Sequence, residues 1–466
     1  MKTTRNFAWF FVAFHILFCY NIVNLGKKVN TMDIYKIISQ MSDDVTPHMV
    51  SLRRDFHKHA EPGWLEMRTS SIIAKELTEL GYEVLVGEDV CKRDARMGLP
   101  SDEVLEKAYE RAIKQGADST FIEATKGGMT GVIGILRCGE GPTVAMRFDI
   151  DALGVYESED ADHIPKKEGF ASINTGAMHA CGHDGHAASG LGVAAVIMKI
   201  KEHLHGTIKL IFQPAEEGLR GAKAIVENGH LDDVDYLLGS HITETDEEGN
   251  DITAGSYGSL ASFKYDVTYH GLSAHAGGNP QAGKNALLAA ACAVTNLYAI
   301  PRHSGGASRI NVGRLIAGSG RNVIADEAFM ELEVRGDTTA INEYVSEYAL
   351  RILKNSAEMH GCTVDIKLMG AAESLASDEK LCLRIAEISA NELGLKVSNK
   401  LSEKNGGSED ISYMMNRVQS RGGLTSFMRI QTDCAGVAHN RKFDFDEGYL
   451  PKAVKVFCAA TYDLMK

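Results

Sequence analysis

The sequence is poor in proline and in basic residues, and its cysteines form no close pairs. Only 9 of its 466 residues are proline, 44% are hydrophobic, and it has no internal repeat or low-complexity segment, which excludes a disordered or collagen-like chain. Its 9 cysteines are scattered without a CxxC pair, a pattern typical of reduced thiols in a cytoplasmic protein and not of a disulfide scaffold. The 49 basic against 62 acidic residues give a net charge of -13, which argues against a nucleic-acid or anionic-membrane binder because such a surface needs clustered Lys and Arg.

The N-terminal segment has three explanations that stay open. Residues 7–25 carry no charged side chain and are flanked on both sides by basic residues. They would suit a signal peptide or a membrane anchor, although no small-residue cleavage site follows and a histidine and two asparagines interrupt the apolar run. The third explanation is a misassigned start, in which residues 1–31 are not translated and the protein begins at Met32.

From Met32 onwards the pattern predicts an α/β domain. Helical spacing at 33–57, 69–80, 102–117 and 187–204 alternates with strand patterns at 82–86, 131–138, 142–151, 207–214 and 235–242. The strands are apolar at nearly every position, which indicates a mainly parallel sheet that is covered on both faces. We therefore assign residues 32–255 to the first part of this domain.

The pattern changes between residues 256 and 372. Strands are expected at 262–271, 309–320, 322–337 and 362–370, with helices at 285–297 and 339–360. This β-α-β-β-α-β order is typical of a ferredoxin-like α+β unit. The α/β pattern then resumes over residues 373–466, so the second unit is predicted to be inserted into the first.

The densest polar cluster is the segment MHACGHDGH at residues 178–186. Cys181 and His183 are separated by one residue, and in an extended segment side chains at i and i+2 point the same way, so both could reach one ion. Thiolate and imidazole ligands suit Zn²⁺, and imidazole with carboxylate also suits Mn²⁺. A glycine-rich turn with Asp184 as a helix cap is the less favoured alternative.

Two adjacent carboxylates follow a strongly apolar strand in FQPAEEG. Next to a metal ion such a pair can divide the work, because one carboxylate ligates while the other accepts a proton from the attacking water. His241 closes the strand YLLGSH, and His439 lies in AHNRKFDFDE near the C-terminus. The resulting set provides five ligands, enough for two divalent ions: Cys181, His183, Glu217, His241 and His439. Asp149 and Asp151, in MRFDIDAL, lie where they could orient the ligand histidines.

Taken in order, these motifs resemble the M20 metallopeptidase and amidohydrolase superfamily. The resemblance rests on RRDFHKHAEPGWLE, MRFDIDAL, HACGHDGH, FQPAEEG, HGLSAHAGGNPQAGKNA, INVG, GSED and HNRKFDFDE. It is strongest for the amidohydrolase branch that includes hippurate hydrolases and indole-acetyl-amino-acid hydrolases. It runs from about Met32 to the C-terminus, and it includes a segment at 96–117 that other members of the branch generally lack.

The resemblance implies a fold and roles for single residues. It implies a di-metal catalytic domain with an inserted lid or dimerisation domain, and it matches the same five ligands to two Mn²⁺ or Zn²⁺ ions. Glu216 matches the general base. His275 matches the histidine that crosses a dimer contact to stabilise the oxyanion. Contacts to the substrate carboxylate or the oxyanion are expected from Asn311, Arg321 and Asn322.

The implied function is metal-dependent hydrolysis of the amide bond of N-acyl or N-aroyl amino acids, with p-aminobenzoyl-glutamate as the best single substrate. The expected enzyme is cytoplasmic and works as a homodimer or as a heterodimer with a homologous subunit. Three alternatives remain: a hydrolase of another N-acyl amino acid such as hippurate, a partner-dependent interface subunit, and a purely structural zinc site with four closed ligands.

Overall fold

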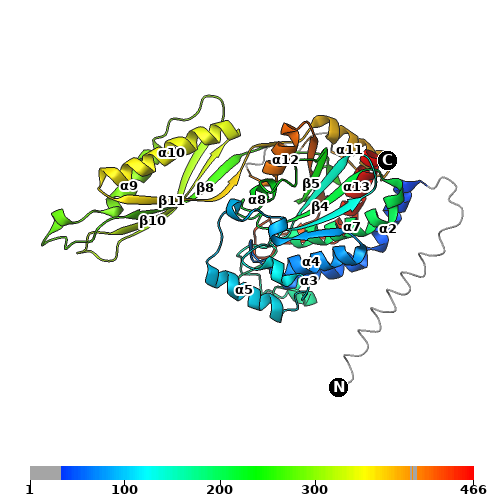
Figure 1. The fold of residues 1–466 in the computed structure, drawn as a ribbon, viewed down its shortest axis with the longest axis horizontal. Coiled ribbons are helices and arrows are strands. Elements are labelled where there is room, and N and C mark those ends of the chain that lie inside the picture. Colours follow the sequence, from blue (N-terminus) through cyan, green and yellow to red (C-terminus); the bar gives the residue numbers. More distant parts are fainter. Residues whose placement is uncertain (1–32, 399–400, 402–406) are drawn as a thin grey trace, which may run out of the picture.

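A computed structural model describes residues 33–398, 401 and 407–466 (Figure 1). The segment 1–31 and its three explanations lie outside the described residues. Within the described ranges, no helix combines the length and the apolar composition that a membrane crossing would need. The eight cysteines of these ranges are all free, and five of them are buried, as expected of reduced thiols that pack as small apolar side chains.

The larger domain is built on a seven-stranded sheet with the order β1-β2-β4-β3-β5-β13-β6. The strands are β1 (Glu83–Val86), β2 (Val132–Arg137), β3 (Thr143–Asp149), β4 (Thr207–Gln213), β5 (Tyr236–Glu244), β6 (Ile252–Thr253) and β13 (Leu424–Thr432). The four central strands β4, β3, β5 and β13 are parallel, whereas β1, β2 and β6 pair in the antiparallel sense. The predicted mainly parallel sheet is therefore confirmed.

Helices cover both faces of this sheet, which is why its strands are apolar at nearly every position. One apolar cluster contains α2 (Ile34–Asp44), α3 (Thr46–Lys58), α4 (Met67–Leu80), α7 (His183–Ile200), α11 (Glu379–Asn391) and α13 (Tyr449–Met465). The cluster on the other face contains α8 (Ala222–Val226) and α12 (Ile411–Ser420). Helix α7 packs closely against the sheet because it is rich in glycine and alanine. A Cβ atom on Gly190 would lie 2.7 Å from the Phe212 ring.

Two expected helices have different boundaries in the structure. The segment 33–57 forms two helices, α2 and α3, because Pro47 stands in the first turn of α3, where its missing N–H is tolerated. The helix expected at 187–204 already begins at His183 and ends at Ile200. The exposed helix predicted at 102–117 is α5 (Asp102–Lys114), and its Lys107–Glu103 and Lys114–Glu110 ion pairs have the expected i,i+4 spacing.

The second domain projects from the first on the left of Figure 1. It consists of β8 (Ala261–His270), α9 (Ala286–Tyr298), β9 (Ser308–Ala317), β10 (Glu327–Gly336), α10 (Thr339–Met359) and β11 (Thr363–Ala372). Its antiparallel sheet has the order β11-β8-β10-β9, so the predicted ferredoxin-like insertion is confirmed. The chain enters on β8 and returns on the neighbouring strand β11. The exact boundaries, at residues 256 and 372, stay predictions. We call this unit the lid.

Smaller elements complete the described chain. They are α6 (Ile164–Glu168), β7 (Tyr257–Ser259), β12 (Leu375–Ala376), β14 (Cys434–Ala435) and β15 (Asp444–Phe445), with short 3-10 helices η1 (Gly87–Asp89), η2 (Arg93–Ala95), η3 (Ile122–Thr125), η4 (Lys201–His203) and η5 (Pro280–Ala282). Strands β7 and β12 pair with each other next to the lid connections, and β14 pairs with β15 close to His439.

Candidate metal and active site

A cavity of about 840 Å³ lies at the carboxyl ends of the parallel strands, where α/β proteins usually bind ligands. Its wall includes four of the five predicted metal ligands, Cys181, Glu217, His241 and His439, and the predicted base Glu216. The lid contributes Lys264 and Arg335. The site thus lies between the two domains, and both supply side chains to it.

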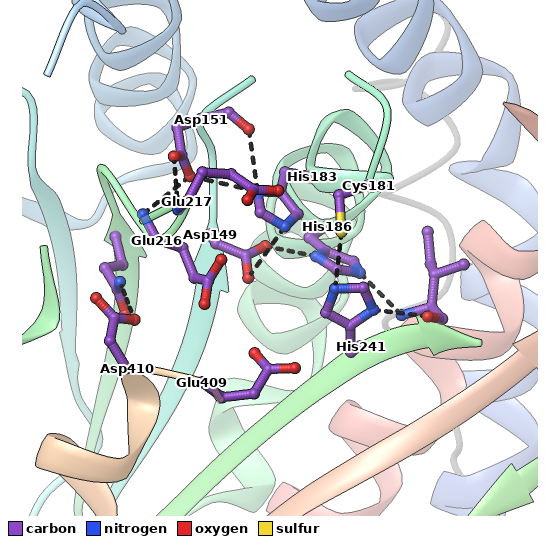
Figure 2. A network of polar contacts seen from close by, with 12 residues as sticks. Asp149, Asp151, Cys181, His183, His186, Glu216, Glu217, His241, Glu409 and Asp410 are labelled. Carbon is purple, nitrogen blue, oxygen red and sulfur yellow. Dashed lines mark hydrogen bonds and ion pairs between the residues drawn. The ribbon is translucent and has the colours of Figure 1, made fainter. Parts of the chain in front are cut away.

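Cys181 and His183 reach the site by a different backbone path from the one expected. The segment is not extended, because Gly182 has a left-handed φ of 86° and α7 begins at His183. Such a φ strains any residue with a Cβ, so glycine is required between the two donors. The Cys181 Sγ lies 3.4 Å from His241 Nε2, and His183 projects from the first turn of the helix (Figure 2). The two donors still converge, but through a turn.

Asp151 holds the two strand-end motifs together. Its Oδ1 accepts a hydrogen bond from the Glu216 backbone N–H at 3.1 Å, and its Oδ2 accepts one from the Glu217 N–H at 2.9 Å. His183 Nδ1 donates to the Asp151 backbone carbonyl at 3.0 Å (Figure 2). This bond places the proton of a neutral His183 on Nδ1 and leaves Nε2 free as a ligand atom.

Replacing Asp151 by asparagine is expected to weaken metal binding by about 10- to 100-fold, the range seen when the support of a ligand is lost. An asparagine amide has only one acceptor oxygen, so its NH₂ group would face one of the two backbone N–H groups. A metal titration against a competing chelator measures the effect. Asp162→Asn, at an exposed position, is the matched control, and equal affinities for the two variants would contradict the role of Asp151.

His241 and His439 approach the same place from two other elements. His241 lies within β5, three residues before its end and not at its terminus as expected, and its Nδ1 donates to the Ile242 carbonyl at 2.6 Å. His439 has a left-handed φ of 68°, and its backbone N–H donates to the Ala180 carbonyl at 2.7 Å. Its Nε2 lies 3.4 Å from Glu217 Oε1. Both rings therefore present Nε2 to the cavity.

The donor atoms fit a metal centre. In each of three groups the ligand atoms lie within 4.8 Å of one another: Cys181, His183 and His241; Cys181, Glu217 and His439; His183, Glu216 and Glu217. In the described part of the chain, the buried atoms His183 Nε2 and Glu217 Oε1 make no hydrogen bond; their contacts are long, 3.7 Å from His183 Nε2 to Asp149 Oδ2 and 3.4 Å from Glu217 Oε1 to His439 Nε2. Buried polar atoms are rarely left unpaired, so a cation in contact with both atoms would account for them. The residues present can hold a metal ion.

A fourth donor group, with Asp149, His183 and His186, has another explanation. His186 Nδ1 is hydrogen-bonded to Asp149, and its Nε2 accepts the Ile242 N–H at 3.0 Å, so neither nitrogen is available as a ligand. Although burial raises the pKa of Asp149, Arg147 and the two histidines hold it well below its usual value. The Asp149 carboxylate is thus a buried anion that fixes His186 and faces His183.

The electrostatics of the cavity favour a bound cation. Burial, followed by Glu409, Asp410 and Glu217, raises the pKa of Glu216 well above its usual value. Burial also raises the pKa of the Cys181 thiol to about 12, although His183 opposes the shift. A divalent ion would reverse both effects, because it stabilises carboxylate and thiolate anions.

The four lid residues with predicted roles do not line this cavity. His275, Arg321 and Asn322 are exposed in loops at the end of the lid that is remote from the larger domain, where His270 pairs with Glu327. His275 Nδ1 accepts the N–H groups of Gly277 and Gly278 at 3.1 and 2.8 Å. Asn311 is exposed on β9 and lines a separate cavity of about 540 Å³. Within one chain these residues and the metal donors are apart.

The sequence motifs did not predict several charged residues around the cavity, among them Lys264, Glu409, Asp410 and Arg429. Glu409 points towards His241 and Glu216 in Figure 2. Asp410 accepts a hydrogen bond from Gln213 at 2.8 Å and from the Ala222 N–H at 2.9 Å. Arg429 interrupts a buried strand, and a charged residue within a strand that is otherwise uncharged could have identified it as a site candidate.

Comparison with known proteins agrees with this geometry. The family described as Peptidase family M20/M25/M40 matches residues 145–463. The chain is 45% identical to indole-3-acetyl-aspartic acid hydrolase of Enterobacter agglomerans over 90% of its length and 96% of that protein. It is 44% identical to one of the subunits of p-aminobenzoyl-glutamate hydrolase from Escherichia coli, with the same coverages.

Solved structures give the same result. The aminobenzoyl-glutamate utilization protein of Klebsiella pneumoniae is 40% identical and superposes with a TM-score of 0.79 over 91% of this chain and 98% of that chain. A dinuclear metal-binding peptidase of the M20 family from Bacillus subtilis shares the fold, with a TM-score of 0.62 at 24% identity over 91% of this chain and 99% of its own. The chain therefore belongs to peptidase family M20/M25/M40 and is a hydrolase of that family.

Proposed function

We propose that this protein hydrolyses the amide bond of N-acyl or N-aroyl amino acids, and that p-aminobenzoyl-glutamate, split into p-aminobenzoate and glutamate, is the best single substrate. The observation that carries the proposal is the cavity, in which the cluster of metal donors adjoins the Glu216 carboxylate. Glu216 is absent from the two donor groups that contain Cys181, although it belongs to a third group with His183 and Glu217. The names of two relatives, which refer to N-acylated aspartic acid and to p-aminobenzoyl-glutamate, support the substrate class.

Two divalent ions, manganese or zinc, would be held by Cys181, His183, Glu217, His241 and His439, and they would supply Lewis-acid polarisation of the scissile carbonyl and a lower pKa of the attacking water. The protein fixes the donors before binding. Asp151 orients His183 and the Glu216–Glu217 backbone, and the Ile242 carbonyl orients His241. This support leaves Nε2 of both rings free.

Glu216 acts as the general base and then as the acid. Its carboxylate accepts the proton of the attacking water and passes it to the nitrogen of the leaving amine, so that the amine leaves as a neutral group. Its side chain is only 7% exposed, which keeps bulk water from competing for that proton. Because the Glu216 N–H is tied to Asp151, the carboxylate is positioned by the same contact that supports the ligands.

His275 completes the site in a dimer. Its Nδ1 accepts two backbone N–H groups, so the proton of the neutral ring lies on Nε2, where it can be donated to an oxyanion. The lid offers a docking surface, since the edge strand β9 and helix α9 expose Leu287, Leu288, Tyr298, Leu315 and Ile316 at 41–52%. A second chain there, identical or homologous, would bring its His275 to this cavity; Asn311, Arg321 and Asn322 remain proposed substrate contacts.

A release assay tests the proposal against its alternatives. Purified protein is freed of metal with a chelator, reloaded with Mn²⁺ or Zn²⁺, and incubated with p-aminobenzoyl-glutamate, hippurate and other N-acyl amino acids, with and without a homologous second chain. We expect metal-dependent release of glutamate. Preference for hippurate would favour the alternative substrate, and release only with the second chain would favour a partner-dependent subunit. No metal-dependent release under any condition would favour a structural zinc site and contradict the proposal.

The free thiols of the described cysteines support the further proposal of a cytoplasmic enzyme, because such thiols persist in a reducing compartment.

A further inference from the structure

Three basic side chains line the cavity together with its metal donors. Among its described lining residues are Lys264 and Arg335 from the lid and Arg429 from the larger domain. The protein as a whole carries a net charge of -13, so it attracts no anionic substrate by its overall field. Anion binding at this site must therefore come from these local groups. Arg335 already pairs along its own strand with Glu333, through Nε and Nη2 at 3.1 Å each.

Arg429 is a buried guanidinium with unused donors. It lies on β13, directly opposite His241 in the parallel β5–β13 register, and is 7% exposed. Its Nη1 contacts Glu409 Oε1 at 3.4 Å, and its guanidinium stacks 4.7 Å from the centre of the Phe427 ring. In the described part of the chain this is its one hydrogen bond, although a guanidinium has five N–H donors. The stacking on Phe427 fixes the plane of the guanidinium group next to the cavity.

Lys264 is a half-buried ammonium without a direct ion pair in the described residues; burial lowers its pKa, and the carboxylates of Glu333, Glu216 and Glu217 oppose this shift. It lies on β8, opposite Glu333 across the β8–β10 pair, and lines the cavity from the lid side. Within residues 33–398, 401 and 407–466, no carboxylate lies within 4.0 Å of its Nζ and no hydrogen bond is made to it. Removing an ammonium from water without a partner is costly, so an anion from outside the chain is the group that would complete it.

We infer that Arg429 and Lys264 make the enzyme specific for acidic amino acids, each binding one of the two carboxylates of an aspartate or glutamate leaving group. The inference rests on the proposed amide hydrolysis and adds the residues that determine its specificity. A guanidinium fork matches a carboxylate geometrically, and an ammonium serves as a point charge for the second one. A site with two buried cations also rejects a neutral analogue, because one cation would then remain unpaired.

The test compares two substrates that differ only in charge, p-aminobenzoyl-glutamate and p-aminobenzoyl-glutamine. The kcat/KM of each is measured for the metal-loaded full chain and for Arg429→Gln and Lys264→Met. We expect the unchanged enzyme to prefer the glutamate substrate by about 100-fold or more. The variant at the residue that binds the side-chain carboxylate should reduce this ratio to below about 10-fold, mainly through a higher KM for the glutamate substrate. The other variant should raise the KM of both substrates alike, because p-aminobenzoyl-glutamine keeps the α-carboxylate. Arg429→Lys should recover part of the loss seen in Arg429→Gln, since lysine keeps the positive charge but not the planar guanidinium.

Lys367→Met is the matched control, because Lys367 is exposed on the lid strand β11 and should leave the ratio unchanged. If both Arg429→Gln and Lys264→Met lower the activity on the two substrates equally, neither residue recognises the side-chain carboxylate, and the inference fails. It also fails if neither variant changes the ratio by more than twofold. In both cases the release of p-aminobenzoate still supports the proposed hydrolysis. If the unchanged enzyme cleaves neither substrate, nor any other N-acyl amino acid, the proposed function and the inference fail together.

Discussion

Replacing Glu216 by glutamine is expected to lower kcat by about 100- to 10,000-fold, the usual contribution of a general base, while the bound metal content stays unchanged. Glutamine keeps the shape of the side chain but cannot accept the proton of the attacking water. The metal content should persist because the five proposed ligands Cys181, His183, Glu217, His241 and His439 remain, although Glu216 also belongs to one donor group, with His183 and Glu217. Steady-state kinetics with p-aminobenzoyl-glutamate and metal analysis of the same sample measure both quantities.

The neighbouring carboxylate provides the control for this experiment. Glu217 lies within 4.8 Å of Cys181 and His439 as a potential ligand, and its buried Oε1 lacks a hydrogen-bond partner in the described chain. Glu217→Gln should therefore lose metal and activity together. If Glu216→Gln retained near-full activity, or if it lost metal as Glu217→Gln does, Glu216 would not be the base.

Much of the site could be predicted because strand ends and polar motifs coincide in this fold. The FQPAEEG and MRFDIDAL motifs follow β4 and β3, which are adjacent parallel strands, so their carboxylates meet at one edge of the sheet. Parallel neighbouring strands end at the same edge of a sheet, and the alternation of strands and helices in the sequence is enough to predict a parallel sheet. The extended geometry predicted for Cys181 and His183 is wrong, since periodicity does not show that Gly182 adopts a left-handed φ.

The remaining parts depend on contacts between distant elements. Arg429 and Lys264 come from a late strand of the larger domain and the first strand of the lid, and only the docking of the two domains brings them to one cavity. His186 has the spacing of a ligand, yet a buried aspartate and a backbone N–H occupy both of its nitrogens. A single sequence does not show whether the nitrogens of a histidine are already hydrogen-bonded within the fold. The lid residues illustrate the same limit, because the register of β8 and β10 places His275 away from its own cavity.

A buried ion network supports the start of α7, the helix that carries His183. Arg53 is 1% exposed, and its Nε donates to Asp184 Oδ2 at 2.9 Å. Its Nη2 contacts Asp444, and its Nη1 lies 3.3 Å from Glu447. Although burial raises the pKa of Asp184, Arg53 and His57 hold it below its usual value, so the carboxylate is charged. The network thus joins α3, α7 and β15 through buried charges.

Arg53→Met is expected to lower the free energy of unfolding by about 3–5 kcal/mol, because Asp444 would remain buried without its cation and Asp184 would keep only His57, at 2.8 Å, as a side-chain partner. The methionine replaces most of the apolar contact with the Phe445 ring, which lies 4.3 Å from the guanidinium, so the loss would be chiefly electrostatic. The shift is measured as the change in the urea unfolding midpoint, followed by circular dichroism of the metal-free protein so that altered metal binding does not contribute.

Arg54, the next residue, is the control for Arg53 because it also forms ion pairs but is less buried. Arg54 pairs with Glu447 at 2.8 Å and Glu168 at 2.9 Å, but its side chain is 34% exposed, and solvent-exposed ion pairs contribute about 0–1 kcal/mol. Arg54→Met should therefore change stability by less than about 1 kcal/mol. A double variant, Arg53→Met with Asp444→Leu, removes one of the uncompensated charges and should recover part of the loss. Equal effects of the two single variants, or no recovery in the double variant, would show that the Arg53 network does not stabilise the fold through its buried charges.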